Sequence, residues 1–216
     1  FAVRALVGAT MMVGALSVSP ALAAKDVTFA VSLALETLDP YNTNSTLNQA
    51  AGKAYYEGLY EFDKDLKMQP KLATEYSVSS DGLEYTFFLR RGVKWQANAL
   101  FKPSRDFNAD DVIFTLQRSW KPDHPYFHIT HSDHPYFNDM AMGELITQIR
   151  KVDDYTVKFV LREPVAPFVA NLAMSWAGVL IISISRHKAR LNAWAHKKTA
   201  SFVDMPYGAT APFVTP

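Results

Sequence analysis

The sequence contains no cysteine among its 216 residues. Without thiols the chain can form no disulfide framework and offers no thiolate ligand to a metal. An excess of one charge is also absent, because 22 Lys and Arg residues face 21 Asp and Glu residues, for a net charge of +1 at pH 7. This balance predicts neither a nucleic-acid-binding surface nor a basic patch for anionic lipid.

Recognisable catalytic motifs are missing as well. The sequence has no G-x-S-x-G nucleophile elbow, no H-E-x-x-H zinc motif and no glycine-rich phosphate loop. The adjacent carboxylates Asp110 and Asp111 lie where the start of a helix favours negative charge. We therefore predict that the chain is not an enzyme and that it carries no cofactor.

The N-terminal segment has the composition of an export signal. Arg4 supplies a positive charge, Ala5–Val18 is apolar but short for a membrane span, and Ala21–Leu22–Ala23 is a small-residue cleavage site. We predict a signal peptide over residues 1–23, with a membrane anchor as the less favoured alternative. Because no cysteine follows the cleavage site, we expect a periplasmic protein without a lipid anchor.

Turn residues and alternating hydrophobicity predict several strands. Residues 76–78 and 84–89 flank an Asp81–Gly82 turn, which is a strong hairpin signal. Residues 27–31 are a further candidate strand. The run Thr156–Leu161 alternates, which places Val157, Phe159 and Leu161 on one face of a strand.

Helical spacing appears in three places. Apolar residues at intervals of three and four predict helices over residues 46–60 and 164–176. Asn108 is a suitable N-cap for a third helix, with Asp110 and Asp111 in its first turn. Residues 122–139 are predicted to be a long loop, and residues 143–152 could form a short helix or a strand.

Short motifs follow one another in a fixed order along the chain. They are TLDP at 37–40, YEGL at 56–59, DGLEYTFFLR at 81–90, VDDYTV at 152–157 and PVAPF at 164–168. Each motif alone is weak, but their shared order and spacing resemble the family 5 extracytoplasmic solute-binding proteins. That family comprises the peptide-binding subunits of ABC importers, with occasional nickel- or glutathione-binding members.

The resemblance implies an α/β fold like that of periplasmic binding proteins (type II, cluster C), with a mixed sheet and helices. Family members are much longer, so we expect an N-terminal fragment that holds only part of the first lobe. After the signal peptide, residues 24–61 would begin that lobe (domain Ia). Residues 62–200 would form a domain Ib-like subdomain, and residues 201–216 a truncated segment returning toward the lobe.

The resemblance also implies the ligand and the partner. It predicts a monomer that binds short peptides by lobe closure, docks on an ABC permease in the inner membrane and does not bind nucleic acid. Family members hold peptide backbone partly by main-chain groups. The resemblance places the ligand-binding edge at Ser32, Leu33, Ala34, Leu35 and Thr37, although an ordinary strand-to-turn connection is the alternative. A single partial lobe cannot close, so we expect weak binding.

Four histidines between positions 124 and 134 support a different hypothesis. His124, His128, His131 and His134 carry imidazoles, which suit nickel, zinc or copper, and one class of relatives carries nickel or haem. Nearby prolines at 122, 125 and 135 prevent a continuous helix that would align these side chains. We therefore predict an exposed loop and keep a metal- or haem-binding module as the alternative.

Two further features have a structural interpretation. The tryptophans Trp95, Trp120, Trp176 and Trp194 have apolar neighbours and are predicted to lie in the core rather than to form a ligand platform. The basic stretch 185–199 is predicted to be a solvated helix face, with a membrane-surface helix as the alternative.

Overall fold

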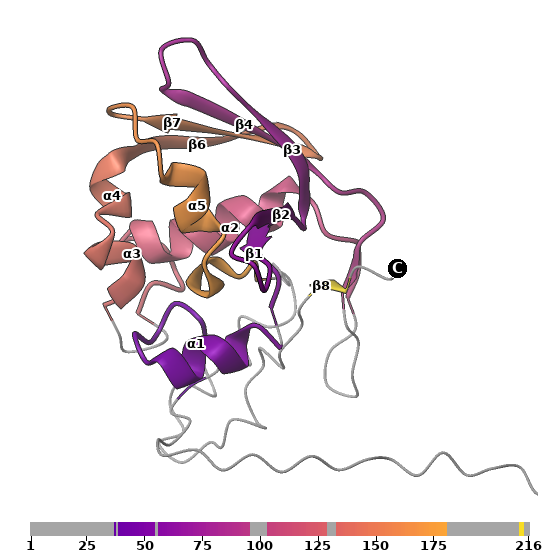
Figure 1. Ribbon diagram of the computed structural model, residues 1–216, viewed down its shortest axis with the longest axis vertical. Helices are drawn as coiled ribbons and strands as arrows, with labels where there is room; N and C mark the ends of the chain where they lie inside the picture. Colours follow the sequence, from indigo (N-terminus) through magenta and orange to yellow (C-terminus); the bar gives the residue numbers. More distant parts are fainter. Residues whose placement is uncertain are drawn as a thin grey trace, which may run out of the picture. The chain divides into compact units, whose positions relative to one another are not determined.

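A computed structural model describes most of the central part of the chain (Figure 1). The chain divides into two compact units, residues 1–32 and 33–216, and everything described lies in the second. The described residues are 37, 39–54, 56–95, 103–128 and 133–180, together with the backbone of the strand 212–213. The predicted signal peptide, the strand at 27–31 and the basic stretch 185–199 lie outside them, and the domain boundaries remain predictions.

Short helices and strands alternate along the described chain. In order they are α1 (Thr46–Gly52), β1 (Tyr60–Phe62), β2 (Met68–Pro70), β3 (Ala73–Val78), β4 (Glu84–Leu89), β5 (Lys94–Trp95), α2 (Ala109–Trp120), α3 (Pro135–Asp139), α4 (Met142–Leu145), β6 (Ile146–Asp153), β7 (Thr156–Leu161), α5 (Phe168–Leu172), a 3-10 helix (Ser175–Ala177) and β8 (Pro212–Phe213). None of the helices in the described ranges is both long and apolar enough to cross a membrane.

A four-stranded antiparallel sheet with the order β3-β4-β7-β6 forms one layer. Its central pairing places Tyr85 opposite Phe159, and Ile149 lies opposite Phe159 on the other side. Helix α2 packs against β6 and β7, so the helices cover one face of the sheet (Figure 1). The predicted alternation of β7 is confirmed, because Val157, Phe159 and Leu161 are all buried.

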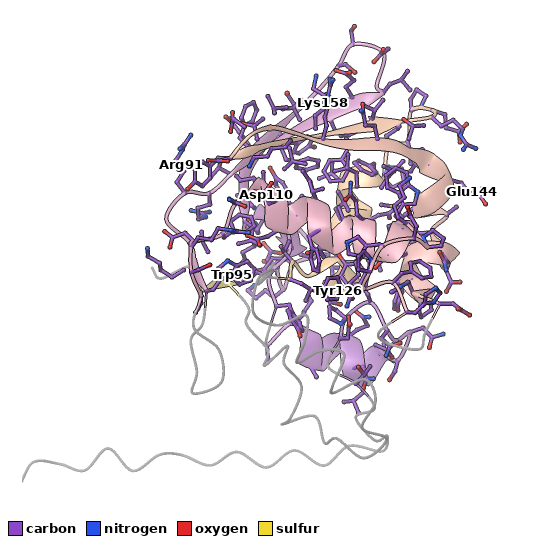
Figure 2. All side chains as sticks on the ribbon, turned by 180° about the vertical axis from the view of Figure 1, so that it is seen from behind. Arg91, Trp95, Asp110, Tyr126, Glu144 and Lys158 are labelled. Atoms are coloured by element: carbon purple, nitrogen blue, oxygen red, sulfur yellow. The ribbon has the colours of Figure 1, made fainter. Side chains whose placement is uncertain are left out.

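The opposite face of the sheet carries ion pairs as well as the partly exposed Phe88. Lys158 lies 2.6 Å from one carboxylate oxygen of Glu84, and Arg150 lies 3.5 Å from the other. Figure 2 labels Lys158 on the sheet, and its partner Glu84 lies 74 residues earlier in the chain. Partly exposed ion pairs of this kind contribute little stability, typically about 0–1 kcal/mol. The fully buried aromatic side chains of the sheet, Phe87 and Phe159, lie instead on the helix-covered face.

The predicted β3–β4 hairpin is confirmed, and β3 starts earlier than expected. The amide of Gly82 donates to the Ser79 carbonyl at 2.9 Å, and the amide of Leu83 donates to the Asp81 carboxylate at 3.0 Å. Gly82 has φ of +74°, a left-handed conformation that favours glycine. The turn therefore needs a residue at position 82 that tolerates a left-handed backbone, and glycine meets this need.

A Gly82→Ala variant is expected to lose about 1–2 kcal/mol of unfolding free energy for the left-handed backbone, plus a packing cost. The added Cβ would lie 3.1 Å from the Cβ of Pro164. Gly92→Ala is the matched control, because Gly92 has φ of +73° but open space around its Cβ position. Urea unfolding of both variants should show the larger loss of unfolding free energy for Gly82→Ala. Equal losses would show that the contact with Pro164 adds no cost.

Two predicted helices are shorter than their sequence patterns. Helix α1 ends at Gly52 rather than near residue 60, since the Glu57 carbonyl accepts from Val179 and the Gly58 carbonyl accepts from Leu72. These long-range bonds compete with helix continuation. In the 164–176 segment the helix begins only after Pro167, because proline lacks an amide hydrogen and restricts the residue before it.

Helix α2 begins as predicted, at Asn108. The Asn108 side chain accepts from the Asp110 amide at 3.0 Å, and the Asp111 carboxylate accepts from the Asn108 amide at 3.0 Å. This reciprocal capping box satisfies helix-start donors that would otherwise be unpaired.

Farther along, residues 143–152 contain both the predicted helix and the predicted strand, since α4 leads directly into β6. The predicted loop 122–139 ends early, because α3 occupies residues 135–139.

Candidate ligand-binding site

The predicted ligand-binding edge is only partly within the described residues. Ser32, Leu33, Ala34 and Leu35 lie outside them, whereas Thr37 is described and half-buried. The Thr37 hydroxyl oxygen accepts a hydrogen bond from the Asp39 amide at 3.1 Å. Thr37 is therefore tied directly to the turn that follows the predicted edge.

That turn contains Asp39 and Pro40 of the TLDP motif. The Asn42 amide donates to the Asp39 carbonyl at 3.1 Å, and the Tyr41 amide donates to the Asp39 carboxylate at 3.0 Å. Helix α1 braces the turn, because the Gln49 side-chain amide donates to the Pro40 carbonyl at 3.0 Å. The turn is thus held both by its own residues and by the first helix.

A buried ion pair joins the turn to α2. The Arg118 guanidinium donates two hydrogen bonds to the Asp39 carboxylate, at 2.7 and 2.8 Å. The Arg118 side chain is 0% exposed and that of Asp39 is 10% exposed. The two-pronged geometry fixes the orientation of both groups as well as their distance. The partners are 79 residues apart in the sequence, so α2 holds a segment far from it along the chain.

The electrostatics keep this pair ionised. Burial alone would raise the pKa of the Asp39 carboxyl, but the charge of Arg118 and the hydrogen bonds from Arg118 and the Tyr41 amide lower its pKa below the ordinary value. Burial raises the pKa of the neighbouring Tyr41 phenol. Above the acid range the site therefore contains a carboxylate, a guanidinium and a neutral phenol.

Arg118 is a residue of this site that the sequence did not predict. Its position gave a usable signal, because it lies three residues after Thr115 and six after Val112, which both lie on the buried side of α2. A buried arginine needs an acidic partner. The TLDP aspartate was available for that role, although no local pattern connects residues so distant in sequence.

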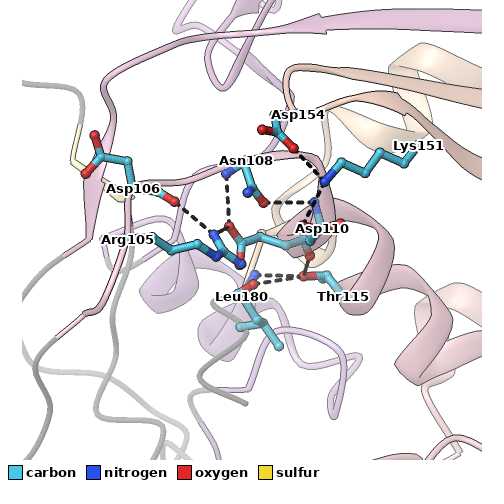
Figure 3. Close-up of polar contacts among 9 residues, drawn as sticks. Arg105, Asp106, Asn108, Asp110, Thr115, Lys151, Asp154 and Leu180 are labelled. Carbon is cyan, nitrogen blue, oxygen red and sulfur yellow. Dashed lines mark hydrogen bonds and ion pairs between the residues drawn. The ribbon is translucent and has the colours of Figure 1, made fainter. Parts of the chain in front are cut away.

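The two carboxylates at the start of α2 have structural partners. Arg105 pairs with both oxygens of Asp111, at 2.6 and 2.8 Å. Lys151 pairs with Asp110 at 3.0 Å and with Asp154 at 2.6 Å (Figure 3). Both carboxylates therefore serve to fix α2 against its neighbours, in line with the structural interpretation of their position.

Helix α2 also holds the described chain at Leu180. The Thr115 hydroxyl accepts from the Leu180 amide at 2.9 Å and lies 3.2 Å from the Leu180 carbonyl, to which it can donate (Figure 3). The same hydroxyl lies 2.7 Å from the Asp111 carbonyl in its own helix. A buried side chain of α2 thus contacts both backbone polar groups of Leu180.

The histidines are not gathered in one exposed loop. His128 is exposed and His131 lies outside the described residues. The His124 ring packs against Phe114, with ring centres 5.3 Å apart. His134 is 0% exposed, so the prediction of an exposed loop is wrong there. It has φ of +48° at the start of α3, and its Nε2 lies 3.2 Å from the Phe127 carbonyl.

The environment of His134 opposes charge. Burial and the nearby Arg118 cation lower the pKa of the His134 imidazole, and those two effects outweigh the Phe127 carbonyl and the surrounding carboxylates. Across the described ranges, no group of three histidine, aspartate or glutamate side chains is placed to hold a metal ion. The metal alternative therefore gains no support from the three described histidines.

One interior cavity lies beside the buried pair. It has a volume of about 10 Å³, and its walls include Tyr41, Thr115 and Val112. Ligand pockets for small molecules are usually about 300–1,000 Å³, so this cavity cannot be a peptide site.

Trp95 and Trp176 are buried, as predicted for core residues. Trp120 is half-buried, and Trp194 lies outside the described residues.

Known proteins resemble the chain over most of its length. The dipeptide-binding protein of Escherichia coli (strain K12) is 40% identical over 168 residues, which are 77% of this chain and 31% of that protein. Heme-binding protein A of Haemophilus influenzae is 42% identical over 135 residues, or 62% of this chain and 25% of that protein. The chain thus spans about a third or less of these relatives.

The fold is also that of a solved relative. The crystal structure of the dipeptide binding protein from Pseudoalteromonas sp. SM9913 in complex with Met-Leu matches with a TM-score of 0.65 and 34% identity. The match covers 72% of this chain and 31% of that one. The predicted fold class, a part of a periplasmic-binding-protein fold, is therefore confirmed. The family model for "Bacterial extracellular solute-binding proteins, family 5 Middle" matches residues 67–214, and the chain belongs to this family.

Proposed function

We propose that the chain is part of the substrate-binding subunit of an ABC importer for short peptides. The observation that carries this proposal is the 40% identity to a dipeptide-binding protein over 77% of the chain. The likeness to a structure in complex with Met-Leu supports the same ligand class. In this proposal the protein is a binding protein and not an enzyme, and its partner is a permease in the inner membrane.

Within this function, we assign the ligand edge to Ser32, Leu33, Ala34, Leu35 and Thr37. The support comes from the turn that follows it. The Asp39 amide binds the Thr37 hydroxyl, and Asp39 is fixed by Arg118. We expect a backbone edge at these positions to pair with the main chain of an extended peptide. Side-chain selectivity would then come from the rest of the site.

The proposed location is the periplasm, with residues 1–23 removed as a signal peptide and no lipid anchor. The near-neutral charge of +1 agrees with a partner that is neither nucleic acid nor anionic lipid. We propose a monomer, because lobe closure around a ligand requires no second copy.

Haem is the second candidate ligand, because one relative at 42% identity is named heme-binding protein A. The described histidines do not favour it. His134 is fully buried, while His124 packs against Phe114 and Tyr126 rather than facing an open pocket. Peptide is therefore the preferred ligand class, and haem is the class to test against it.

Titration of the purified, ¹⁵N-labelled chain with the dipeptide Met-Leu tests the proposal. One lobe supplies only part of the contacts made on closure. We therefore expect a Kd on the order of 1 mM or weaker, which corresponds to a favourable binding free energy of about 4 kcal/mol or less. The Thr37 and Asp39 amide signals should shift. Haemin and Ni²⁺ are the comparison ligands; shifts confined to His124 and His128 with either, and none with Met-Leu, would favour the alternative.

A further inference from the structure

Two partly or fully buried histidines lie in the chain that joins α2 to α3. The described residues of this chain are 121–128 and 133–134, which together form the α2–α3 connection. His124 lies near its start, and His134 lies at its end, where α3 begins. The ordinary pKa of an imidazole is about 6.5, so the charge of both rings can change near neutral pH.

The His124 ring is packed as a neutral base. Its centre lies 5.3 Å from that of Phe114 on α2 and 5.8 Å from that of Tyr126. Tyr126 completes the cluster, because its ring centre lies 5.4 Å from that of Phe114 (Figure 2). Nδ1 of His124 accepts a hydrogen bond from the Tyr126 amide at 3.3 Å, so this nitrogen carries no proton. Protonation would turn it into a donor and break the contact.

His134 is also placed as an uncharged ring. Its side chain is buried, and its ring centre lies 5.0 Å from that of Phe127. Nε2 lies 3.2 Å from the Phe127 carbonyl, which can only accept, so Nε2 is the nitrogen that donates. A second ring proton would place a full charge out of reach of water, which is costly. Both imidazoles therefore suit the packed connection only as neutral rings.

The charges that face the two rings oppose their protonation. Burial and the Arg118 cation on α2 lower the pKa of His124 and of His134. The carboxylates that act in the opposite direction are Asp123 for His124, and Asp39 and Asp133 for His134. They do not outweigh burial and Arg118. A single cation on α2 therefore acts on both histidines of the connection.

The sign of the pH effect follows from these directions. Because each folded pKa lies below the ordinary value of about 6.5, the packed rings bind fewer protons than exposed rings do. Their attachment is fully present above that pH and is lost as the pH falls through the lower folded pKa values. The Asp39–Arg118 pair persists further into acid, because the folded pKa of Asp39 is below about 3.9. The connection can thus separate while the pair on α2 remains.

We propose that the α2–α3 connection is an acid-released segment. His124 and His134 hold it in place as neutral rings, and each ring frees its part of the segment when it takes up a proton from solvent. The released state keeps the four-stranded sheet and the Asp39–Arg118 pair. No residue of the connection belongs to the proposed peptide-binding edge, so the release is independent of the peptide ligand.

Amide hydrogen exchange in the whole ¹⁵N-labelled chain, from about pH 7.5 to about pH 5, measures the release. The Tyr126 and Phe127 amides both donate to His124. After correction for the intrinsic pH dependence of exchange, their opening should increase about three- to tenfold, the effect of one lost hydrogen bond. The Leu161 amide, which donates to the Leu83 carbonyl, should not change. An equal increase at Leu161 would indicate global unfolding and overturn the proposal.

Variants that cannot titrate test the two rings. His124→Asn keeps an acceptor for the Tyr126 amide, because asparagine readily bonds the backbone two residues on. His134→Gln keeps a side-chain N–H for the Phe127 carbonyl. The double variant should lose the pH dependence of exchange at Tyr126. His128→Gln is the matched control, since His128 is exposed in the same connection, and it should behave like wild type. Wild-type pH dependence in the double variant, or its loss in His128→Gln, would overturn the proposal.

The ring nitrogens provide a test that needs no variant. Their ¹⁵N chemical shifts in wild type report which of them carry protons. At about pH 7.5 Nδ1 of His124 should carry none, and it should take up a proton over the pH interval in which the Tyr126 amide opens. A proton on Nδ1 at neutral pH, or proton uptake without opening at Tyr126, contradicts the proposal even if the variants fail to fold.

Discussion

Replacing Arg118 by methionine is expected to lower the free energy of unfolding by about 3–5 kcal/mol, the usual cost of removing one partner of a buried ion pair. The variant would leave the Asp39 carboxylate, which is only 10% exposed, without its guanidinium. It would also release the turn at Asp39–Asn42 from α2. Urea unfolding followed by circular dichroism measures the loss directly.

A double-mutant cycle with Asp39→Asn isolates the pair itself. Each single variant should be strongly destabilised, but the double variant should lose less than the sum, because no buried charge is then left unpaired. Ser119→Ala is the neighbouring control on α2 and should stay within about 0.5 kcal/mol of wild type. A loss below about 1 kcal/mol for Arg118→Met would show that water reaches the site.

The same pair should make the protein sensitive to acid. The pKa of Asp39 is lowered in the folded state, so the unfolded chain binds the proton first as the pH falls. The stabilisation is fully present above the ordinary aspartate pKa of about 3.9 and is lost as the pH falls through the lower folded-state pKa. Asp39→Asn should abolish this component of the dependence of unfolding free energy on pH. An unchanged dependence in the variant would show that other groups cause it.

Local signals predicted the parts of the fold that depend on local chemistry. The Asp81–Gly82 turn predicted the hairpin because the turn needs a left-handed residue, and Asn108 predicted the start of α2 because its side chain can cap the helix. The alternation of Val157, Phe159 and Leu161 predicted the buried face of β7, since one face of the sheet packs against helices. These elements require no knowledge of distant residues.

The errors and omissions come from long-range contacts. Helix α1 stops early because the backbone around Gly58 bonds with segments near Leu72 and Val179. His134 is buried because α3 starts there and places its ring against Phe127. The Asp39–Arg118 pair joins positions 79 residues apart. In the candidate site, Thr37 remains a prediction from the sequence, and nothing in the sequence indicated that α2 holds the turn after it.

Core packing leads to the second large effect. Phe159 lies in β7 at the centre of the sheet and is 0% exposed. Its ring centre is 5.3 Å from that of Phe87 in β4 and 5.6 Å from that of Phe168 in α5. The side chain therefore joins the sheet to the helix layer, and such edge-to-face pairs add roughly 0.5–1.5 kcal/mol beyond area burial.

Phe159→Ala is accordingly expected to lose about 3–5 kcal/mol of unfolding free energy, because it removes buried surface and leaves a cavity that a β-sheet cannot readily close. Phe88→Ala is the matched control: the same substitution in the adjacent strand, at a residue on the other face that is 37% exposed. It should cost about 1 kcal/mol or less. Urea unfolding of both variants decides the point. Similar losses for the two would mean that the outer face of the sheet is also covered in solution, and that the helix-covered face is not the sole core of the described chain.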